Sequence, residues 1–283
     1  MIRRVMHAGL ALGLGTIATG AVVAYRARYV NPYAPRLERV ALTLPRGHDG
    51  LAGFTIGFVT DTHAGPFIAA EDVARACDLL TPECPDLILL GGDYISESPR
   101  HIHDVVPMLG KLVNTAPCGG YAVLGNHDLS VSGEKVMRAL AAARIQGLRN
   151  QAVAVETGRG TLWVAGIDDT LIGTPDVAGT FAQVPSGAAV LALWHEPEFA
   201  EQTAAHGAFA QLSGHSHGGQ VRLPVLGPVG LPADGRRHVI GLSDAAGMPV
   251  YTSRGVGVYR PPARLNCPPE VTLVTLAAPA GSS

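Results

Sequence analysis

The sequence predicts an α/β (α+β) fold in which a mixed β-sheet, or a sandwich of two mixed sheets, is flanked by helices. Two observations support this prediction. In the first half of the chain, short apolar runs alternate with segments of helical periodicity, which is the β-α-β order of a parallel sheet. In the second half, nearly every apolar run has the length of a strand, with few helical patterns between the runs.

The first half of the chain contains four predicted strands and three predicted helices. An alternation of apolar residues from Val40 to Leu44 predicts a strand with one apolar face, which Pro45 and Gly47 end. Continuous apolar runs predict buried strands at Phe54–Thr60, Asp86–Leu90 and Tyr121–Leu124. Helical spacing of apolar or alanine-rich residues predicts helices at Ile68–Leu80, Val105–Leu112 and Glu134–Arg144.

The second half of the chain is predicted to be mostly β-structure. Its apolar runs are at most six residues long, and residues typical of turns separate them. The predicted strands are Thr161–Ala165, Ala189–Leu193, Ala208–Leu212, His238–Gly241, Val250–Thr252 and Val271–Leu276.

Length and composition narrow the class of protein. A chain of 283 residues is long enough for one α/β domain, and no second domain is needed. Its 47% apolar and 16% charged residues exclude a disordered protein. The net charge of −2 provides no polycationic surface, so a nucleic acid is not expected as a main partner. The four cysteines lack zinc-ribbon spacing, and we expect them to be buried free thiols.

The amino terminus has the pattern of a signal peptide or a membrane anchor. Arg3 and Arg4 precede an uncharged run from Ala8 to Ala24, and Arg26 and Arg28 follow it. Seventeen residues are at the lower end of the length that spans a bilayer, and small residues near the end of the run would suit a signal peptidase. Residues 1–28 are therefore predicted to direct the chain to the membrane or across it, and residues 29–50 to form a connector and the first strand.

Polar side chains follow the predicted strands in five places. Because strand ends in an open α/β sheet border a common crevice, we expect these clusters to lie close together. They are Asp61-Thr62-His63, Gly92-Asp93, Gly125-Asn126-His127-Asp128, His195-Glu196 and Gly214-His215-Ser216-His217-Gly218-Gly219. Asp168 and Asp169 also follow an apolar strand and could support the metal ligands from behind, but a turn at the strand end explains them equally well.

The side chains in these clusters are types that bind divalent metals. Carboxylate, imidazole and amide oxygen without thiolate suit manganese, iron or zinc. Seven candidate ligands are too many for one zinc ion, whereas two ions that share a bridging carboxylate would use them all. The candidates are Asp61, His63, Asp93, Asn126, His195, His215 and His217.

The order D-x-H, G-D, G-N-H-D, H, G-H-x-H resembles the calcineurin-like metallophosphoesterase family over positions 54 to 220. The stretch Asn266–Thr272 and the basic apolar start resemble one branch of this family, although less specifically. This is a membrane-associated or exported bacterial branch that includes phosphodiesterases and some lipid-precursor pyrophosphatases. The resemblance implies two mixed β-sheets packed as a sandwich flanked by helices, the four-layer metallophosphoesterase architecture. It also implies that residues 51–283 form the catalytic domain, located at a bacterial cell membrane or exported to the periplasm or cell surface.

The resemblance also implies a role for each candidate residue. Asp93 would bridge two divalent ions, His127 would protonate the leaving-group oxygen, and Asp128 would orient the His127 imidazole. Gly125 and Gly214 would let the backbone turn sharply, and Gly92, Gly218 and Gly219 would leave room for phosphate. One ion would be held by Asp61, His63, Asp93 and His217, and the other by Asp93, Asn126, His195 and His215.

The predicted function is hydrolysis of a phosphodiester or pyrophosphate by a hydroxide that two metal ions activate, on a lipid-linked or nucleotide-linked substrate. The alternatives are a phosphomonoesterase acting on proteins or small molecules, and a non-catalytic metal-binding protein of the cell envelope. His127 favours an enzyme, because a structural metal site needs no proton donor beside it.

The segment from Val221 to Pro232 is apolar and rich in proline and glycine, and Arg222, Arg236 and Arg237 lie at its start and beyond its end. It is expected to be either a buried core loop or a loop that contacts a lipid surface.

Overall fold

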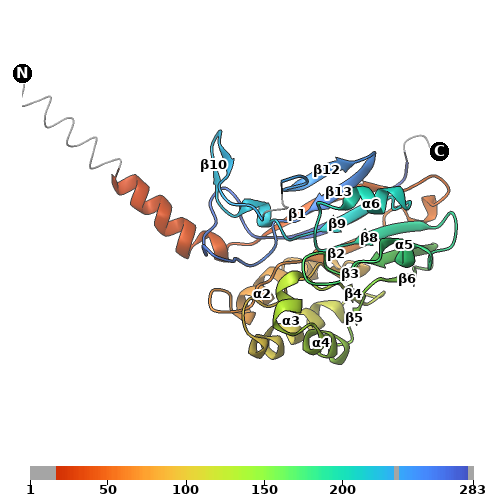
Figure 1. The fold of residues 1–283 in the computed structure, drawn as a ribbon, viewed down its shortest axis with the longest axis horizontal. Helices are drawn as coiled ribbons and strands as arrows, with labels where there is room; N and C mark the ends of the chain where they lie inside the picture. The colour runs from red at the N-terminus through yellow and green to blue at the C-terminus, as the bar shows by residue number, and fades with distance from the viewer. Residues whose placement is uncertain (1–16, 233–235, 280–283) are drawn as a thin grey trace, which may run out of the picture.

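The computed structural model describes residues 17–232 and 236–279, and two six-stranded sheets form its centre (Figure 1). In the first sheet β14 is antiparallel to β2, and the other neighbouring strands are parallel. Its strands lie in the order β1 (Arg36–Thr43), β14 (Glu270–Ala277), β2 (Thr55–Val59), β3 (Leu87–Leu90), β4 (Gly120–Ala122) and β5 (Gln146–Gly147).

The second sheet is also mixed. Its two outer pairs are antiparallel and its inner strands are parallel. Its strands lie in the order β12 (Gly241–Ala245), β13 (Met248–Thr252), β9 (Ala210–Ser213), β8 (Ala189–Leu193), β7 (Thr161–Gly166) and β6 (Gln151–Glu156). A separate hairpin pairs β10 (Arg222–Leu223) with β11 (Gly227–Pro228).

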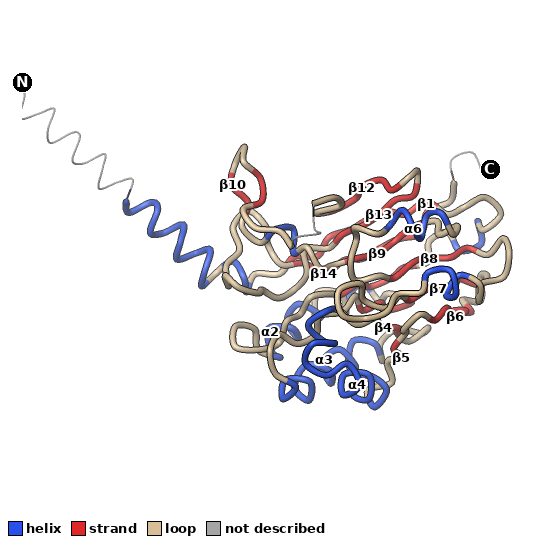
Figure 2. Tube along the Cα trace, viewed as in Figure 1, coloured by secondary structure: helices blue, strands red, loops and turns tan. Residues whose placement is uncertain are grey.

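The two sheets pack face to face and helices cover both outer faces (Figures 1 and 2). The core between the sheets joins Phe58 and Leu89 of the first sheet to Leu191 and Leu212 of the second. On the first sheet lie α2 (Ala70–Cys77), α3 (Ile102–Val113) and α4 (Asn126–Ala142), and on the second α5 (Val177–Phe181) and α6 (Ala200–Ala205). The predicted four-layer sandwich of two mixed sheets is therefore confirmed.

Short 3₁₀ turns connect several elements. They lie at η1 (Asn31–Tyr33), η2 (Asp49–Leu51), η3 (Thr81–Glu83), η4 (Pro99–His101) and η5 (His217–Gly219).

A helix over residues 17–29 projects from the body of the molecule and leads into η1 (Figure 1). Only part of the predicted signal or anchor segment is covered, because residues 1–16 lie outside the described part of the chain. Within the described residues, none of the helices has both the length and the apolar character needed to cross a bilayer.

Several predicted boundaries differ from the structure. The strand predicted at His238–Gly241 is wrong: His238 bonds to the Ser243 hydroxyl, and β12 begins only at Gly241. The helix predicted from Glu134 is the second part of α4, which begins at Asn126 and breaks at Ser132. The elements β6, α5 and α6 were not predicted, because β6 is an edge strand with one buried side chain and the two helices are too short to show a period.

The prediction of buried free thiols is only half correct. All four cysteines are free, but only Cys77 and Cys267 are buried, while Cys84 is exposed and Cys118 is half-buried.

Candidate metal centre

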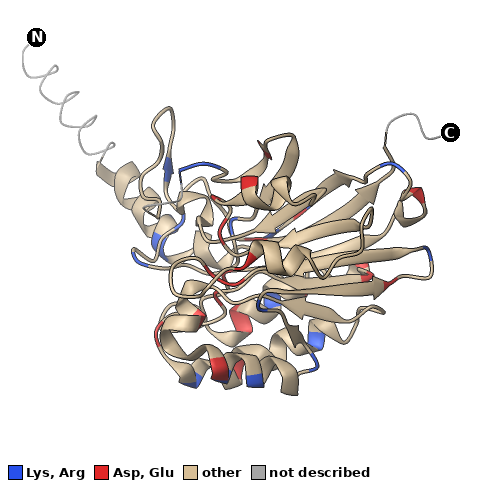
Figure 3. Ribbon diagram, turned by 45° about the vertical axis from the view of Figure 1, so that its right-hand side comes forward, with Lys and Arg blue, Asp and Glu red and all other residues tan. Residues whose placement is uncertain are grey.

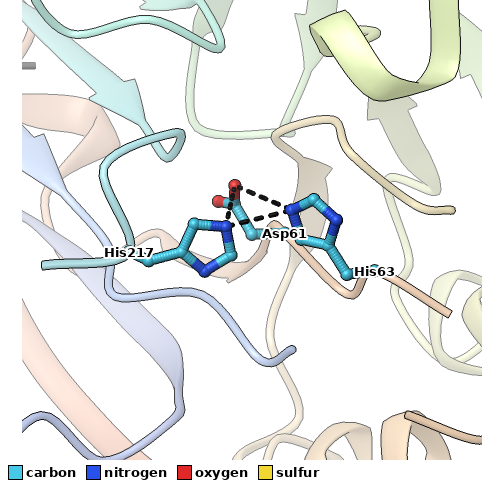
Figure 4. Close-up of side chains that lie close together, drawn as sticks. All are labelled: Asp61, His63 and His217. Carbon is cyan, nitrogen blue, oxygen red and sulfur yellow. Dashed lines mark hydrogen bonds and ion pairs between the residues drawn. The ribbon is translucent and has the colours of Figure 1, made fainter. Parts of the chain in front are cut away.

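The carboxyl ends of strands from both sheets bring the predicted clusters together. Asp61 and His63 follow β2, Asp93 follows β3, and Asn126 opens α4 after β4. From the second sheet, His195 follows β8, and His215 and His217 follow β9. Figure 4 shows Asp61, His63 and His217 converging from both sheets.

The converging atoms are imidazole Nε2 atoms and carboxylate oxygens. His217 Nε2 lies 3.4 Å from Asp61 Oδ1 and 3.0 Å from His63 Nε2 (Figure 4). On either side of Asp93 Oδ2 lie His63 Nε2 at 3.4 Å and His195 Nε2 at 3.3 Å. Three sets have ligand atoms within 4.8 Å of one another: Asp61, His63 and His217; His63, Asp93 and His127; and Asp61, Asp93 and His195.

Two predicted ligand atoms are buried without a hydrogen bond of normal geometry among the described residues. Oδ1 of Asn126 is one, and the other is Nε2 of His195, whose ion-pair contact with Asp93 Oδ2 is 3.3 Å long. Buried polar atoms are almost always paired, so an atom without a partner in a polar cavity points to a ligand. A divalent cation would satisfy both atoms, and the donor set of carboxylate, imidazole and amide oxygen fits such an ion.

In two of the imidazoles, a hydrogen bond at Nδ1 leaves the other ring nitrogen, Nε2, available to bind a metal. Nδ1 of His195 lies 2.7 Å from the carbonyl oxygen of Gly91, which only accepts, so Nδ1 carries the proton. Nδ1 of His63 lies 3.3 Å from Oγ of Ser96, and this hydroxyl donates to the His63 carbonyl oxygen at 3.0 Å. This pattern is typical of metal-binding histidines, whose second nitrogen is held by a neighbour.

Electrostatics at the centre favour neutral imidazoles at His63 and His217, whereas the ionised Asp93 carboxylate favours a protonated His195. Burial lowers the pKa of His63 to about 3 and the pKa of His217 well below its usual value. Burial alone would raise the pKa of the Asp93 carboxyl, but His195 and then His63 hold it below its usual range. Burial opposes charge on His195 as well, and the Asp93 carboxylate outweighs it and raises the pKa of that imidazole. A cation between these groups would replace the proton that they share.

The backbone at the site is strained. Five of the seven candidate ligands have positive φ angles between 44° and 65°, a region that non-glycine residues rarely adopt. Such strain persists only where the surrounding structure enforces it, and it is concentrated at functional sites. The five residues are Asp61, His63, Asp93, His215 and His217.

The left-handed turns predicted at Gly125 and Gly214 are not found there. Gly125 and Gly214 are needed for close approach, because a Cβ at either would collide with the carboxylate of Asp93 or Asp61. The left-handed turns fall instead at Gly92, Gly218 and Gly219, whose φ angles are 94°, 60° and 78°.

Asp128 does not orient the His127 imidazole as predicted. It occupies the first turn of α4, where its carboxylate accepts hydrogen bonds from the amides of Gly125 at 3.1 Å and Tyr94 at 2.9 Å. Nδ1 of His127 instead lies 3.0 Å from the carbonyl oxygen of Ser96. Asp128 therefore fixes the loop that carries Asn126 and His127, and Ser96 holds the imidazole.

Sequence reasoning missed Ser96 and also Arg264, whose side chain is fully buried. The guanidinium donates to the carbonyl oxygens of Gly255, Gly257 and Cys267, and its Nη2 lies 3.5 Å from Nδ1 of His217. These hydrogen bonds hold the loop from Gly255 to Gly257, which packs on Asp61. No spacing in the sequence marks this arginine, because its partners are backbone atoms.

The two other acidic residues at a strand end belong to a turn. Asp168 forms a two-pronged ion pair with Arg149, with contacts of 3.0 and 2.8 Å. Asp169 Oδ1 accepts hydrogen bonds from the amides of residues 171–173. Both residues therefore take part in a turn after β7.

A four-layer sandwich with aspartate, asparagine and histidine side chains gathered at the strand ends defines a metal-dependent phosphoesterase. The model of the calcineurin-like phosphoesterase family matches residues 54–219, and the chain belongs to this family. It is accordingly a hydrolase of phosphoester bonds that depends on divalent metal.

Relatives of known sequence extend over almost the whole chain. An uncharacterized metallophosphoesterase of Bacillus subtilis (strain 168), YkuE, is 32% identical over 98% of each chain. The phosphodiesterase YaeI of Escherichia coli (strain K12) is 35% identical over 92% of this chain and 95% of that protein. Among solved structures, a 5′-nucleotidase precursor from Thermus thermophilus aligns with a TM-score of 0.47 and 15% identity, over 72% of this chain and 49% of that chain.

Proposed function

We propose that the protein hydrolyses phosphodiesters or pyrophosphates at a site for two divalent ions. Asp93 would be shared, with Asp61, His63 and His217 on one side of it and Asn126, His195 and His215 on the other. The support is the position of Asp93 Oδ2 between the Nε2 atoms of His63 and His195, at 3.4 and 3.3 Å. When bound, two such ions would supply an activated water and neutralise charge on the phosphoryl group.

His127 is the proposed proton donor to the leaving group. Its Nδ1 faces the Ser96 carbonyl oxygen and keeps its proton there, so the proton transferred to the leaving group would come from Nε2 of the doubly protonated imidazolium. The imidazole lines the same cavity as His63 and Asp93, as a donor to a bound phosphoester must.

A diester is favoured over a monoester by the shape of the cavity beside the metal centre. The cavity has a volume of about 710 Å³ and extends past the candidate ligands to an apolar wall that includes Leu171, Val229 and Leu231. An organic substituent on phosphorus would bury this wall, and a diester brings two such substituents where a monoester brings one. The name of the Escherichia coli relative, a phosphodiesterase, agrees with this proposal.

A lipid-linked substrate is proposed because an exposed apolar hairpin borders the cavity and an exposed apolar helix lies at the same end of the molecule. At the tip of the β10–β11 hairpin Val225 is fully exposed and Leu226 is 79% exposed, so the segment is not the buried core loop that was one expectation. The helix over residues 17–29 exposes Ile17, Val22 and Tyr25. Exposed apolar side chains of this kind are typical of surfaces that contact membranes.

The hairpin and the N-terminal helix are held together by one segment. Arg264 bonds to Ala27 and Asn31 of the N-terminal region, and its neighbours Leu265 and Asn266 bond to Arg222 of the hairpin. Both features project from the same end of the molecule (Figure 1), and both carry arginines, Arg26 and Arg28 on the helix and Arg222 on β10 (Figure 3). We propose that this end contacts an anionic lipid surface, with location at a bacterial membrane or in the exported compartment.

Substrate comparison tests the proposal. The metal-loaded protein should hydrolyse bis-p-nitrophenyl phosphate faster than p-nitrophenyl phosphate, and a UDP-linked sugar lipid should be a substrate. Faster hydrolysis of the monoester would support the phosphomonoesterase alternative instead.

A further inference from the structure

Tyr259 is an aromatic residue of the catalytic cavity that neither the motifs nor the proposed mechanism uses. It lies in the loop between β13 and β14 and lines the same cavity as the candidate ligands. Its ring centroid is 4.5 Å from that of His127, with 60° between the ring planes, and 5.7 Å from that of His63. Tyr259 therefore packs against the proposed proton donor.

The backbone of Tyr259 is held to the loop that carries the last histidine motif. Oε1 of Gln220 accepts a hydrogen bond from the Tyr259 amide at 2.9 Å, and Nε2 of Gln220 donates to the Tyr259 carbonyl oxygen at 3.3 Å. Gln220 comes three residues after His217 and has a φ of 48°. One side chain thus satisfies both backbone groups of Tyr259 and sets its distance from the metal centre.

A second link joins the Tyr259 loop to the segment that holds His127. Arg260 forms an ion pair with Glu97, with 3.0 Å between Nη2 and Oε1. Glu97 directly follows Ser96, whose carbonyl oxygen faces Nδ1 of His127. Because the pair is exposed, its own contribution is small, but it lies where the two segments meet.

The His127 ring needs a contact on its face, because its single hydrogen bond holds only one edge. The second side-chain torsion of histidine is broad and has no sharp minima, so a hydrogen bond at Nδ1 still allows the ring to tilt. His63 lies against the imidazole in an edge contact, with 4.8 Å between centroids and 78° between planes. Together with Tyr259 it confines the ring.

We propose that Tyr259 is a positioning residue that confines the His127 imidazole, so that its Nε2 faces the oxygen of the leaving group. The inference rests on the proposed function, in which His127 donates that proton. Its specific consequence concerns the leaving group: a misplaced donor slows the departure of a basic alcohol or phenol, but has little effect on an anion that leaves without a proton.

The test compares methyl phenyl phosphate with methyl p-nitrophenyl phosphate as substrates of the full-length, metal-loaded protein. For Tyr259→Ala we expect kcat to fall about 10- to 100-fold on the phenyl ester and less than about threefold on the p-nitrophenyl ester. Tyr259→Phe keeps the ring and should behave as wild type on both. Leu171→Ala, at an apolar residue that lines the same cavity, is the matched control and should change the rates on the two esters by the same factor.

Two further variants guard against a trivial loss of structure. In His127→Ala, adding Tyr259→Ala should cause no further loss on the phenyl ester, because the group that it positions is gone. Gln220→Asn tolerates the positive φ but shortens the clamp, and should produce a milder loss confined to the phenyl ester.

Equal losses of kcat on both esters, or effects of Tyr259→Ala and His127→Ala that multiply, would overturn the inference. Loss of bound metal in Tyr259→Ala would also overturn it, because the Tyr259 ring would then hold the ligand His63 in place and not the proton donor His127. A wild-type protein that binds metal but hydrolyses neither ester would refute the proposed function, and the inference with it.

Discussion

The backbone amide of Arg264 donates a hydrogen bond to the carbonyl oxygen of Ala27 over 2.8 Å, which ties the N-terminal helix to the wall of the metal centre. Asn31 strengthens this link, since its Nδ2 donates to the Arg264 carbonyl oxygen at 2.8 Å. The side chain of the same arginine holds the loop that packs on Asp61. The end of the N-terminal helix is therefore part of the folded domain.

This link determines where the chain can be shortened. A cut at about residue 30, just after the predicted signal or anchor segment of residues 1–28, would remove Ala27 and leave a buried amide of Arg264 without its partner. We expect removal of residues 1–24 to leave melting temperature and activity unchanged, whereas removal of residues 1–34 should destabilise the domain by about 1–3 kcal/mol for each lost partner. Thermal unfolding measures the difference. Equal melting temperatures for the two truncations would show that the link contributes nothing.

The variant Ser96→Ala tests whether the Ser96 hydroxyl orients the His63 imidazole for metal binding. The variant loses the hydroxyl that lies 3.3 Å from Nδ1 of His63 but keeps the carbonyl oxygen that faces His127. We expect metal affinity to fall about 10- to 100-fold, with little change in the preference for good leaving groups. Titration of the metal-free protein with Mn²⁺ or Zn²⁺ gives the affinity, and Ser98→Ala, two residues further on, is the control. Unchanged affinity would mean that Ser96 does not orient this imidazole.

The hairpin tip is expected to act on membrane affinity alone. Val225 and Leu226 are exposed, so the double change Val225→Ser and Leu226→Ser should leave the melting temperature unchanged. It should lower binding to vesicles of phosphatidylglycerol and phosphatidylethanolamine, because each methylene removed from contact with lipid costs about 0.8 kcal/mol. Co-sedimentation measures binding, with Leu242→Ser, an exposed position on β12, as the control. A lowered melting temperature with unchanged vesicle binding would assign the tip a structural role.

The parts of the site that could be predicted from sequence are those that follow strands. The clusters around Asp61, Asp93 and His195 each come directly after an apolar run, and parallel strands place such ends at one edge. Ser96 could not be predicted, because its bond to His127 uses a backbone carbonyl that any residue would provide. Tyr259 lies far from His127 in the chain, and only the packing of the two sheets brings them together.

The fold shows the same division between local and tertiary information. Fully buried strands such as β3 and β8 were predicted because every side chain in them is apolar. The edge strand β6 and the five-residue helix α5 have weak patterns of their own and are stabilised by the neighbours on which they pack. The role of Asp128 was misjudged for a related reason, since a carboxylate in the first turn of a helix bonds to the free amides nearby.

The most direct test of two-metal phosphoester hydrolysis compares the wild-type protein with Asp93→Asn. Metal content by mass spectrometry and the rate on bis-p-nitrophenyl phosphate are measured on the same samples. The wild type should bind about two divalent ions per chain, and the variant should lose metal together with at least about a hundredfold in rate, because Asp93 lies between both groups of ligands. Hydrolysis at the wild-type rate by metal-depleted Asp93→Asn would contradict the mechanism.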